Sequence, residues 1–195
     1  MQRQSIDWFL LHGLPRIRIP FAPYGVERSL RDAGRRLIRP GHLLFSWSPL
    51  GLSSLLTRGV DHAALCVEVD GPDINIAEMN RDGFNTLGFD TFCSHSRRVL
   101  ICKCKDFTES YIQEVIRKCW TFQDVVYDTS HDPRNRRLNC AELDALSDFD
   151  GRIDYTTVKS IFFEYPLITP QCLLDAPNVE VVWDSAGKFL GMVKS

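Results

Sequence analysis

Long hydrophobic runs are missing from this chain of 195 residues, and none approaches the roughly 18 apolar residues that span a bilayer. The N-terminal segment contains only a short apolar core with Asp7 beside it, whereas a secretory signal needs a basic start and a longer apolar stretch. These absences predict a protein without a transmembrane segment that stays in the cytoplasm, with export by a non-classical route left open.

A strong net charge is also missing, because 23 Lys and Arg side chains oppose 25 Asp and Glu side chains and leave a net charge of -2. This balance argues against nucleic acid as a partner. The arginines nevertheless crowd the N-terminal part of the chain: Arg16, Arg18, Arg28, Arg31, Arg35, Arg36 and Arg39. Such a run favours an exposed helix face, and the alternative is a patch for an acidic partner or a membrane surface.

The seven cysteines lack the spacing that is typical of metal sites or of a disulfide framework. An odd number cannot pair completely within the chain, and without export the expected state is the reduced thiol. The segment that holds Cys93, His95, Cys102 and Cys104 could suggest zinc, but Cys-x-Cys on an apolar strand differs from the usual Cys-x2-Cys. We therefore predict structural cysteines, no metal and no cofactor.

Hydrophobic periodicity predicts an α+β domain with a mostly antiparallel central sheet flanked by helices. Strands are expected over residues 42–47, 61–69, 74–79, 97–104 and 179–183, with a hairpin turn at 80–83. Helices are expected over residues 5–12, 26–38, 48–59, 108–122 and 140–149, and a polar loop over 128–137. With no internal repeat, the simplest organisation is one domain with an N-terminal arm.

Residues 136–146, "RRLNCAELDAL", place a cysteine at the start of one of these helices. Asn139 is a favoured N-cap residue, and Glu142 follows at the spacing of a capping box. Cys140 would then be the first helical residue, where unpaired backbone N–H groups and the helix dipole favour a thiolate. The alternative is a capped helix whose cysteine merely fills a gap in the core.

The chain has five histidines that could act as the base for this thiol. His62 differs from the other four because it begins an apolar strand. A histidine buried there must be satisfied by specific partners or used, because an unpaired one is costly. Glu78 ends the next strand on the face shared with Ile74 and Ile76, so it lies near His62 if the two strands pair. Taken singly, each of these residues is better explained as a structural group.

The order of these segments resembles the circularly permuted papain-like hydrolases of the YiiX/YaeF type, which are related to the NlpC-type cell-wall peptidases. The similar stretches run from Arg39 to Val182 and read "PGHLLFSW", "SSLLTRGVDHAAL", "IAEM", "DGFNTLGF", "VVYD", "NCAEL" and "ITPQCLLDAPNVEVV". His42, Asp61, Asn139 and Ala141 depart from the family pattern. The Asn-Cys pair resembles the lecithin retinol acyltransferase group, whose members transfer acyl chains.

The resemblance implies a permuted papain-like catalytic domain over residues 39–195, with residues 1–38 as an arm packed on it. Cys140 would be the nucleophile, His62 the base and Glu78 the group that orients the imidazole. Tyr127 and Asp128 match the segment before the nucleophile helix and are expected to line the substrate cleft, with an ordinary turn as the alternative.

The predicted function is a cysteine-dependent hydrolase or acyltransferase that acts on amide or ester bonds through a thioester. Peptides, peptidoglycan fragments and lipids all fit this chemistry. The alternative is a non-catalytic binding domain that docks a partner through the same cleft or the basic arm.

Overall fold

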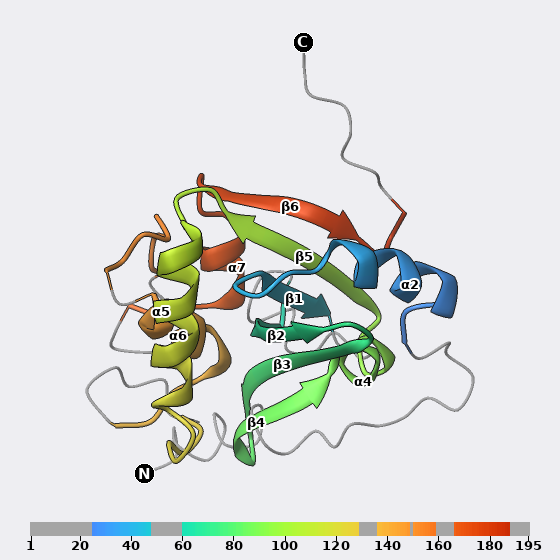
Figure 1. The fold of residues 1–195 in the computed structure, drawn as a ribbon. Coiled ribbons are helices and arrows are strands. Elements are labelled where there is room, and N and C mark those ends of the chain that lie inside the picture. Colours follow the sequence, from blue (N-terminus) through green and yellow to red (C-terminus); the bar gives the residue numbers. More distant parts are fainter. Residues whose placement is uncertain (1–24, 48–59, 129–135, 149, 159–165, 188–195) are drawn as a thin grey trace.

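Six strands pair into one antiparallel sheet within the part of the chain that the structure, a computed structural model, describes: residues 25–47, 60–128, 136–148, 150–158 and 166–187. The strands are β1 (Leu43–Trp47), β2 (His62–Asp70), β3 (Asp73–Asn80), β4 (Gly83–Gly88), β5 (Arg98–Cys104) and β6 (Val179–Asp184). Their spatial order is β4-β3-β2-β1-β5-β6 (Figure 1). The sheet therefore carries β2, the strand that His62 opens, at its centre.

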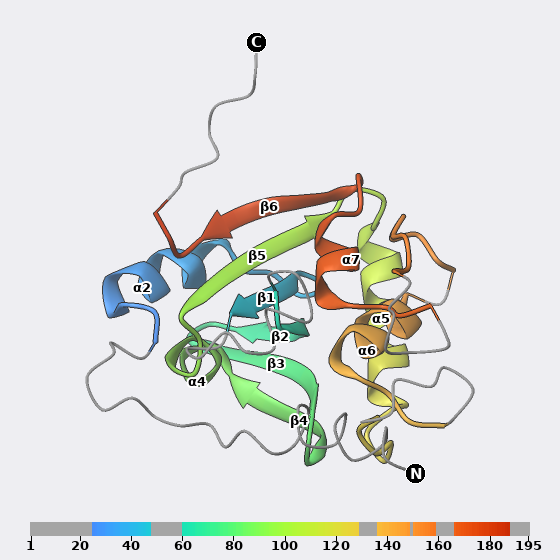
Figure 2. The same cartoon turned by 180° about the vertical axis from the view of Figure 1, so that it is seen from behind.

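Helices cover both faces of the sheet. Helices α5 (Glu109–Trp120), α6 (Cys140–Ser147) and α7 (Pro170–Leu174) gather at one end of the molecule, and α2 (Arg28–Leu37) and α4 (Phe89–Ser94) at the other, in both views (Figures 1 and 2). Among the described residues, no helix is both long enough and apolar enough to cross a membrane.

Alternate residues of each central strand enter two different cores, because successive strand side chains point to opposite faces. In β2, Ala63 and Leu65 join the core that contains α5, α6 and α7. Ala64 and Cys66 join the core that contains α4 and Trp183. Both faces are covered, which explains why this strand reads as a continuous apolar run in the sequence.

Among the helices that the structure describes, α6 is the most enclosed, since it packs against β2 and β3 and also contacts α5 and α7. Every residue from Cys140 to Ser147 is buried except Leu146, which is 45% exposed. The start of this helix consequently lies inside the fold, beside the central strands.

The predicted fold class is confirmed, and so are the strands corresponding to β1, β2, β3, β5 and β6 and the helices corresponding to α2, α5 and α6. The sequence did not predict β4, α4 or α7. β4 is a largely exposed edge strand without an apolar face, and α4 and α7 are helices of only six and five residues. The helices expected at 5–12 and 48–59 lie outside the described residues, as does most of the 128–137 loop, and the arm at 1–38 remains a prediction.

Candidate active site

His62 and Glu78 lie together on neighbouring strands. The antiparallel register places Ala64 opposite Glu78, so His62 is the diagonal neighbour of Glu78 on the same face. His62 Nε2 and Glu78 Oε2 are 2.7 Å apart, and the two side chains are 24% and 12% exposed. Asn80 donates a 2.8 Å hydrogen bond to Glu78 Oε1, and Asn85 also hydrogen-bonds Glu78. The carboxylate is thus held in place from both β3 and β4.

His62 and Glu78 each favour the ionised form of the other. Burial alone would lower the pKa of His62, but hydrogen bonds and charge interactions with Cys140 and Glu78 raise it well above its ordinary value of 6.5. Burial alone would raise the pKa of Glu78, but the hydrogen bond and charge of His62, followed by the two asparagine amides, lower it. Both side chains are therefore ionised around neutral pH.

The stabilising effect of the pair follows from these two directions. The lowered pKa of Glu78 contributes stability that is present above its ordinary value of 4.5 and lost as the pH falls through the folded-state pKa. The raised pKa of His62 contributes stability that is present below 6.5 and lost as the pH rises through its folded-state pKa. The ion pair consequently stabilises the fold across the neutral range.

Cys140 reaches the same histidine from the start of α6. A side-chain hydrogen bond from Cys140 and its charge both raise the pKa of His62, and because Nε2 of His62 already contacts Glu78, Nδ1 is the nitrogen that remains for the thiol. Cys140 is 6% exposed. The structure thus brings together the three residues for which sequence predicted catalytic roles, although they are distant in sequence and come from three different elements.

The capping box predicted at this helix is present. Asn139 Oδ1 accepts hydrogen bonds from the N–H groups of Ala141 and Glu142 at 2.9 and 3.0 Å. Glu142 Oε2 accepts one from the N–H of Asn139 at 2.8 Å. These bonds fix the first turn of α6 and, with it, the position of Cys140.

Removal of this cap is expected to weaken both the fold and the site. Asn139→Ala should lower the free energy of unfolding by about 1 kcal/mol and slow alkylation of Cys140, because the first turn is no longer held. Denaturant unfolding and iodoacetamide kinetics measure the two effects. Thr108→Ala is the matched control, since Thr108 caps the start of α5 through the N–H of Tyr111. It should reduce stability without slowing alkylation, and equal slowing in both variants would contradict the prediction.

Tyr127 and Asp128 lie beside the start of α6. Tyr127 forms a parallel bridge with Leu138, and the N–H of Asp128 donates to the carbonyl of Leu138 at 2.9 Å. Burial raises the pKa of Tyr127, and the charge of Cys140 raises it further. Tyr127 is partly buried and Asp128 is fully buried, so Tyr127 is the residue with surface to offer a ligand. Their roles in substrate binding remain predictions.

Asn80 and Asn85, the two amide partners of Glu78, were not predicted from the sequence. Asn85 lies directly opposite Glu78 in the register of β3 and β4. Recognition of 83–88 as a strand, continuing the predicted hairpin turn, would have placed this amide beside the carboxylate.

The remaining cysteines are buried free thiols. Burial raises the pKa of Cys66, Cys93, Cys102 and Cys119 to about 12 in each case. Cys93 lies in the core on one face of the sheet and Cys102 and Cys104 in the core on the other, so the segment considered for zinc is not assembled as a site. No cluster of three or more His, Cys, Asp or Glu residues suited to a metal ion occurs in the described ranges.

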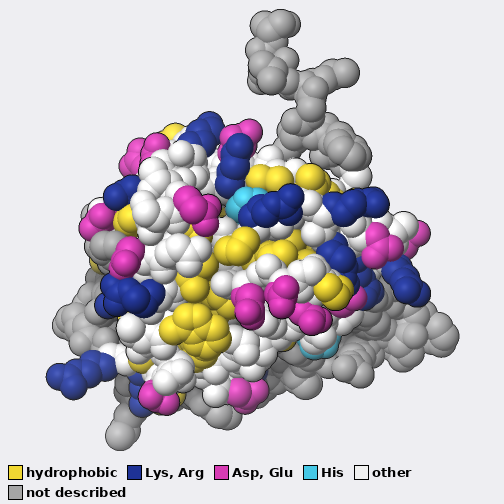
Figure 3. All heavy atoms as spheres, viewed as in Figure 1, with side chains coloured by type: hydrophobic (Ala, Val, Ile, Leu, Met, Phe, Trp, Pro, Cys, Tyr) yellow, Lys and Arg dark blue, Asp and Glu magenta, His cyan; other side chains and the backbone are white. Residues whose placement is uncertain are grey.

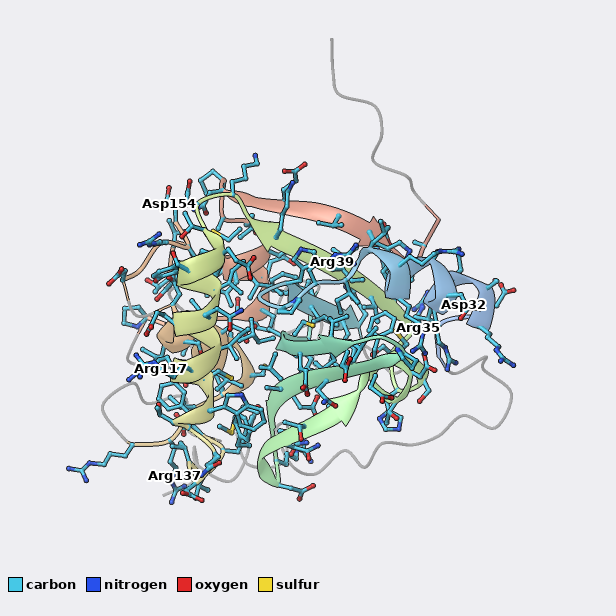
Figure 4. The ribbon with its side chains drawn as sticks, viewed as in Figure 1. Asp32, Arg35, Arg39, Arg117, Arg137 and Asp154 are labelled. Atoms are coloured by element: carbon cyan, nitrogen blue, oxygen red, sulfur yellow. The ribbon has the colours of Figure 1, made fainter. Side chains whose placement is uncertain are left out.

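The arginines of α2 lie away from this site. Figure 3 shows basic side chains gathered over α2 with acidic ones between them, and Figure 4 shows Asp32 and Arg35 on this helix at the end of the molecule opposite α5. Arg35 pairs with Asp90 at 2.5 Å, and Arg31 donates to the carbonyl of Val26 at 2.6 Å. These contacts hold α2 against α4 and against the residues that precede it. A partner for this surface remains a prediction.

Comparisons with known proteins match the fold and not the sequence. Neither a protein-family model nor a curated protein sequence matches this chain. The crystal structure of the metalloprotein YiiX from Escherichia coli O157:H7 is similar, with a TM-score of 0.64 and 15% sequence identity, over 75% of this chain and 97% of that chain. At this identity the likeness concerns the fold alone. The chain therefore has a YiiX-like α+β fold, with Cys140, His62 and Glu78 adjacent at the junction of α6 and the central strands.

Proposed function

We propose that this protein is a cysteine-dependent hydrolase or acyltransferase that acts on amide or ester bonds. The observation that carries the proposal is the shared contact of His62 with Glu78 on one side and Cys140 on the other. A nucleophile, a base and a group that orients the base are the three parts that covalent acyl transfer requires. The permuted papain-like architecture suggested by the sequence belongs to this proposal.

The reaction would proceed in two halves. In the resting pair His62 already holds the proton of the Cys140 thiol as the imidazolium, and the thiolate attacks the substrate carbonyl carbon to form a C–S bond. The backbone N–H of Cys140 is the candidate donor to the oxyanion. His62 then protonates the leaving amine or alcohol as its bond to carbon breaks, and a thioester remains on Cys140. Water, or an acceptor amine or alcohol, loses a proton to His62 and attacks the thioester, and the C–S bond breaks to release the acyl group and restore the Cys140 thiolate beside the His62 imidazolium.

A metal-dependent reaction fits the described residues less well. YiiX is a metalloprotein, but His62 and Glu78 here are bonded to each other, and the described residues contain no cluster of three or more metal-binding side chains arranged for an ion. No step of the proposed reaction passes through a metal. The substrate class stays open among peptide, peptidoglycan fragment and lipid, all of which present the carbonyl that the thiolate needs.

Selective alkylation of the native protein tests the proposal without a known substrate. At about pH 6, iodoacetamide should modify Cys140 and leave the other cysteines intact, because ordinary thiols are protonated there. Peptide mass mapping reads out each site. Cys172 is the internal control, since it is also 6% exposed and near the start of a helix but hydrogen-bonds Thr169. Equal modification of Cys140 and Cys172 would favour the alternative, a non-catalytic binding domain.

A further inference from the structure

Asp144 is a buried acid that the proposed reaction does not use. It follows Cys140 by four residues in α6, a spacing that places both side chains on the same face of a helix. The residue is 1% exposed, and within the described residues neither carboxyl oxygen has a hydrogen-bond partner. Helix α6 packs against β2, whose first residue is His62, and Cys140 acts on His62 from this same face of the helix.

The same helix shows how such an acid is normally accommodated. Asp148, at the end of α6, is also buried, but its carboxylate accepts hydrogen bonds from the hydroxyl of Tyr111 and the N–H of Ile153, both at 2.5 Å. A buried carboxyl without such partners costs stability, and an apolar side chain would fill the same volume without this cost. Groups that break this rule concentrate at functional sites.

The surroundings of Asp144 connect it to the candidate site. Burial raises the pKa of Asp144 well above its ordinary value, and the positive charge of His62 acts in the opposite direction. The charge of Asp144 also acts on Cys119 of α5. The pKa of Cys119 is raised first by burial and then by this charge. The ionisable groups around the carboxyl are thus His62 from β2, Cys119 from α5 and Cys140 from its own helix. Of these, only His62 carries a positive charge.

We propose that Asp144 is a positioning residue of the candidate active site, whose carboxylate helps to hold His62 as the imidazolium. This inference rests on the proposed function, because it assumes that the Cys140–His62 pair is reactive. When Asp144 is protonated, Glu78 and the Cys140 thiolate supply the countercharge of His62. As the pH rises and Asp144 ionises, a further negative charge retains the proton on the imidazole.

This role has a stability cost with a definite sign. Since the folded-state pKa of Asp144 is raised, its protonated form favours the fold below the ordinary value of 3.8, and this contribution is lost as the pH rises through the folded-state pKa. A neutral side chain at position 144 should therefore increase the melting temperature at alkaline pH while weakening the hold on the proton of His62.

The test is the pH profile of Cys140 alkylation by iodoacetamide. An imidazolium–thiolate pair gives a lower inflection where the pair forms and an upper one where the imidazolium loses its proton. Asp144→Asn should leave the lower inflection in place, move the upper one to lower pH and raise the melting temperature at alkaline pH. Asp144→Leu, which needs no hydrogen-bond partner, should behave alike. Asp148→Asn, the matched buried acid, should lower the melting temperature without moving either inflection.

The outcomes separate this inference from the function on which it rests. If Cys140 of the native protein is selectively alkylated but the upper inflection stays in place in both Asp144 variants, the positioning role is wrong and the proposed function stands. If Cys140 of the native protein is no more reactive than Cys172, the proposed function is wrong, and the inference that rests on it is wrong with it. A shift toward lower pH in both Asp144 variants, absent from Asp148→Asn, supports the inference.

Discussion

Cys140→Ser is expected to reduce turnover by at least about a thousandfold while the fold is retained. The substitution exchanges one small side chain for another at a position that is 6% exposed, so packing around α6 changes little. A hydroxyl is far less readily deprotonated by His62 than a thiol, and the thioester intermediate cannot form. Activity-based profiling with a panel of amide and ester probes would measure the loss, and intact-protein mass spectrometry would show whether an acyl adduct forms on the native protein alone.

Cys172→Ser is the matched control for this experiment. Cys172 has the same exposure, lies at the third position of α7 and is hydrogen-bonded with Thr169 at 3.1 Å, and its sulfur otherwise lies near the carbonyl of Leu167. This variant should keep the activity and the adduct of the native protein. Full activity in Cys140→Ser would exclude the proposed mechanism, because no other described cysteine is hydrogen-bonded to His62.

The sequence predicted the parts of the site that local rules determine. The capping box at Asn139 follows from residue types at a fixed spacing, and the proximity of Glu78 and His62 follows from two consecutive strands that form a hairpin. The mostly apolar run of residues 62–69 likewise predicted the strand that forms β2. Each of these features involves interactions between residues that are close in the chain or on adjacent strands.

The features that the sequence did not reveal depend on tertiary packing. β4 is stabilised by its backbone ladder with β3, so "GFNTLG" carries little apolar pattern. In the sequence, Asp144 cannot be distinguished from an ordinary polar residue of a helix. Its burial follows from the enclosure of α6 by the sheet, α5 and α7. The contact of Cys140 with His62 joins segments almost eighty residues apart. Only a resemblance in motif order pointed to it before the structure did.

His62→Ala should reduce turnover by about a hundredfold to ten-thousandfold and should also abolish the selective alkylation of Cys140 at mildly acidic pH. The imidazole is both the base for the thiol and the acid for the leaving group, and without it the thiolate loses its countercharge. The hydrogen bonds and charge interactions that raise the pKa of His62 disappear with the ring, so Glu78 is left as a buried carboxylate with two amide partners. Iodoacetamide kinetics and probe turnover measure the two losses independently.

His42→Ala distinguishes a catalytic histidine from a structural one. His42 is also largely withdrawn from solvent, and its Nδ1 accepts a hydrogen bond from the N–H of Arg39 at 3.2 Å. Burial lowers the pKa of His42 to about 4, aided by the charges of Arg39 and Lys103, so this ring is neutral at pH 7. Its loss should cost stability through packing and leave Cys140 reactive. Unchanged activity in His62→Ala would show that the base is misassigned, and equal losses in both variants would attribute the effect to the fold instead of the imidazole.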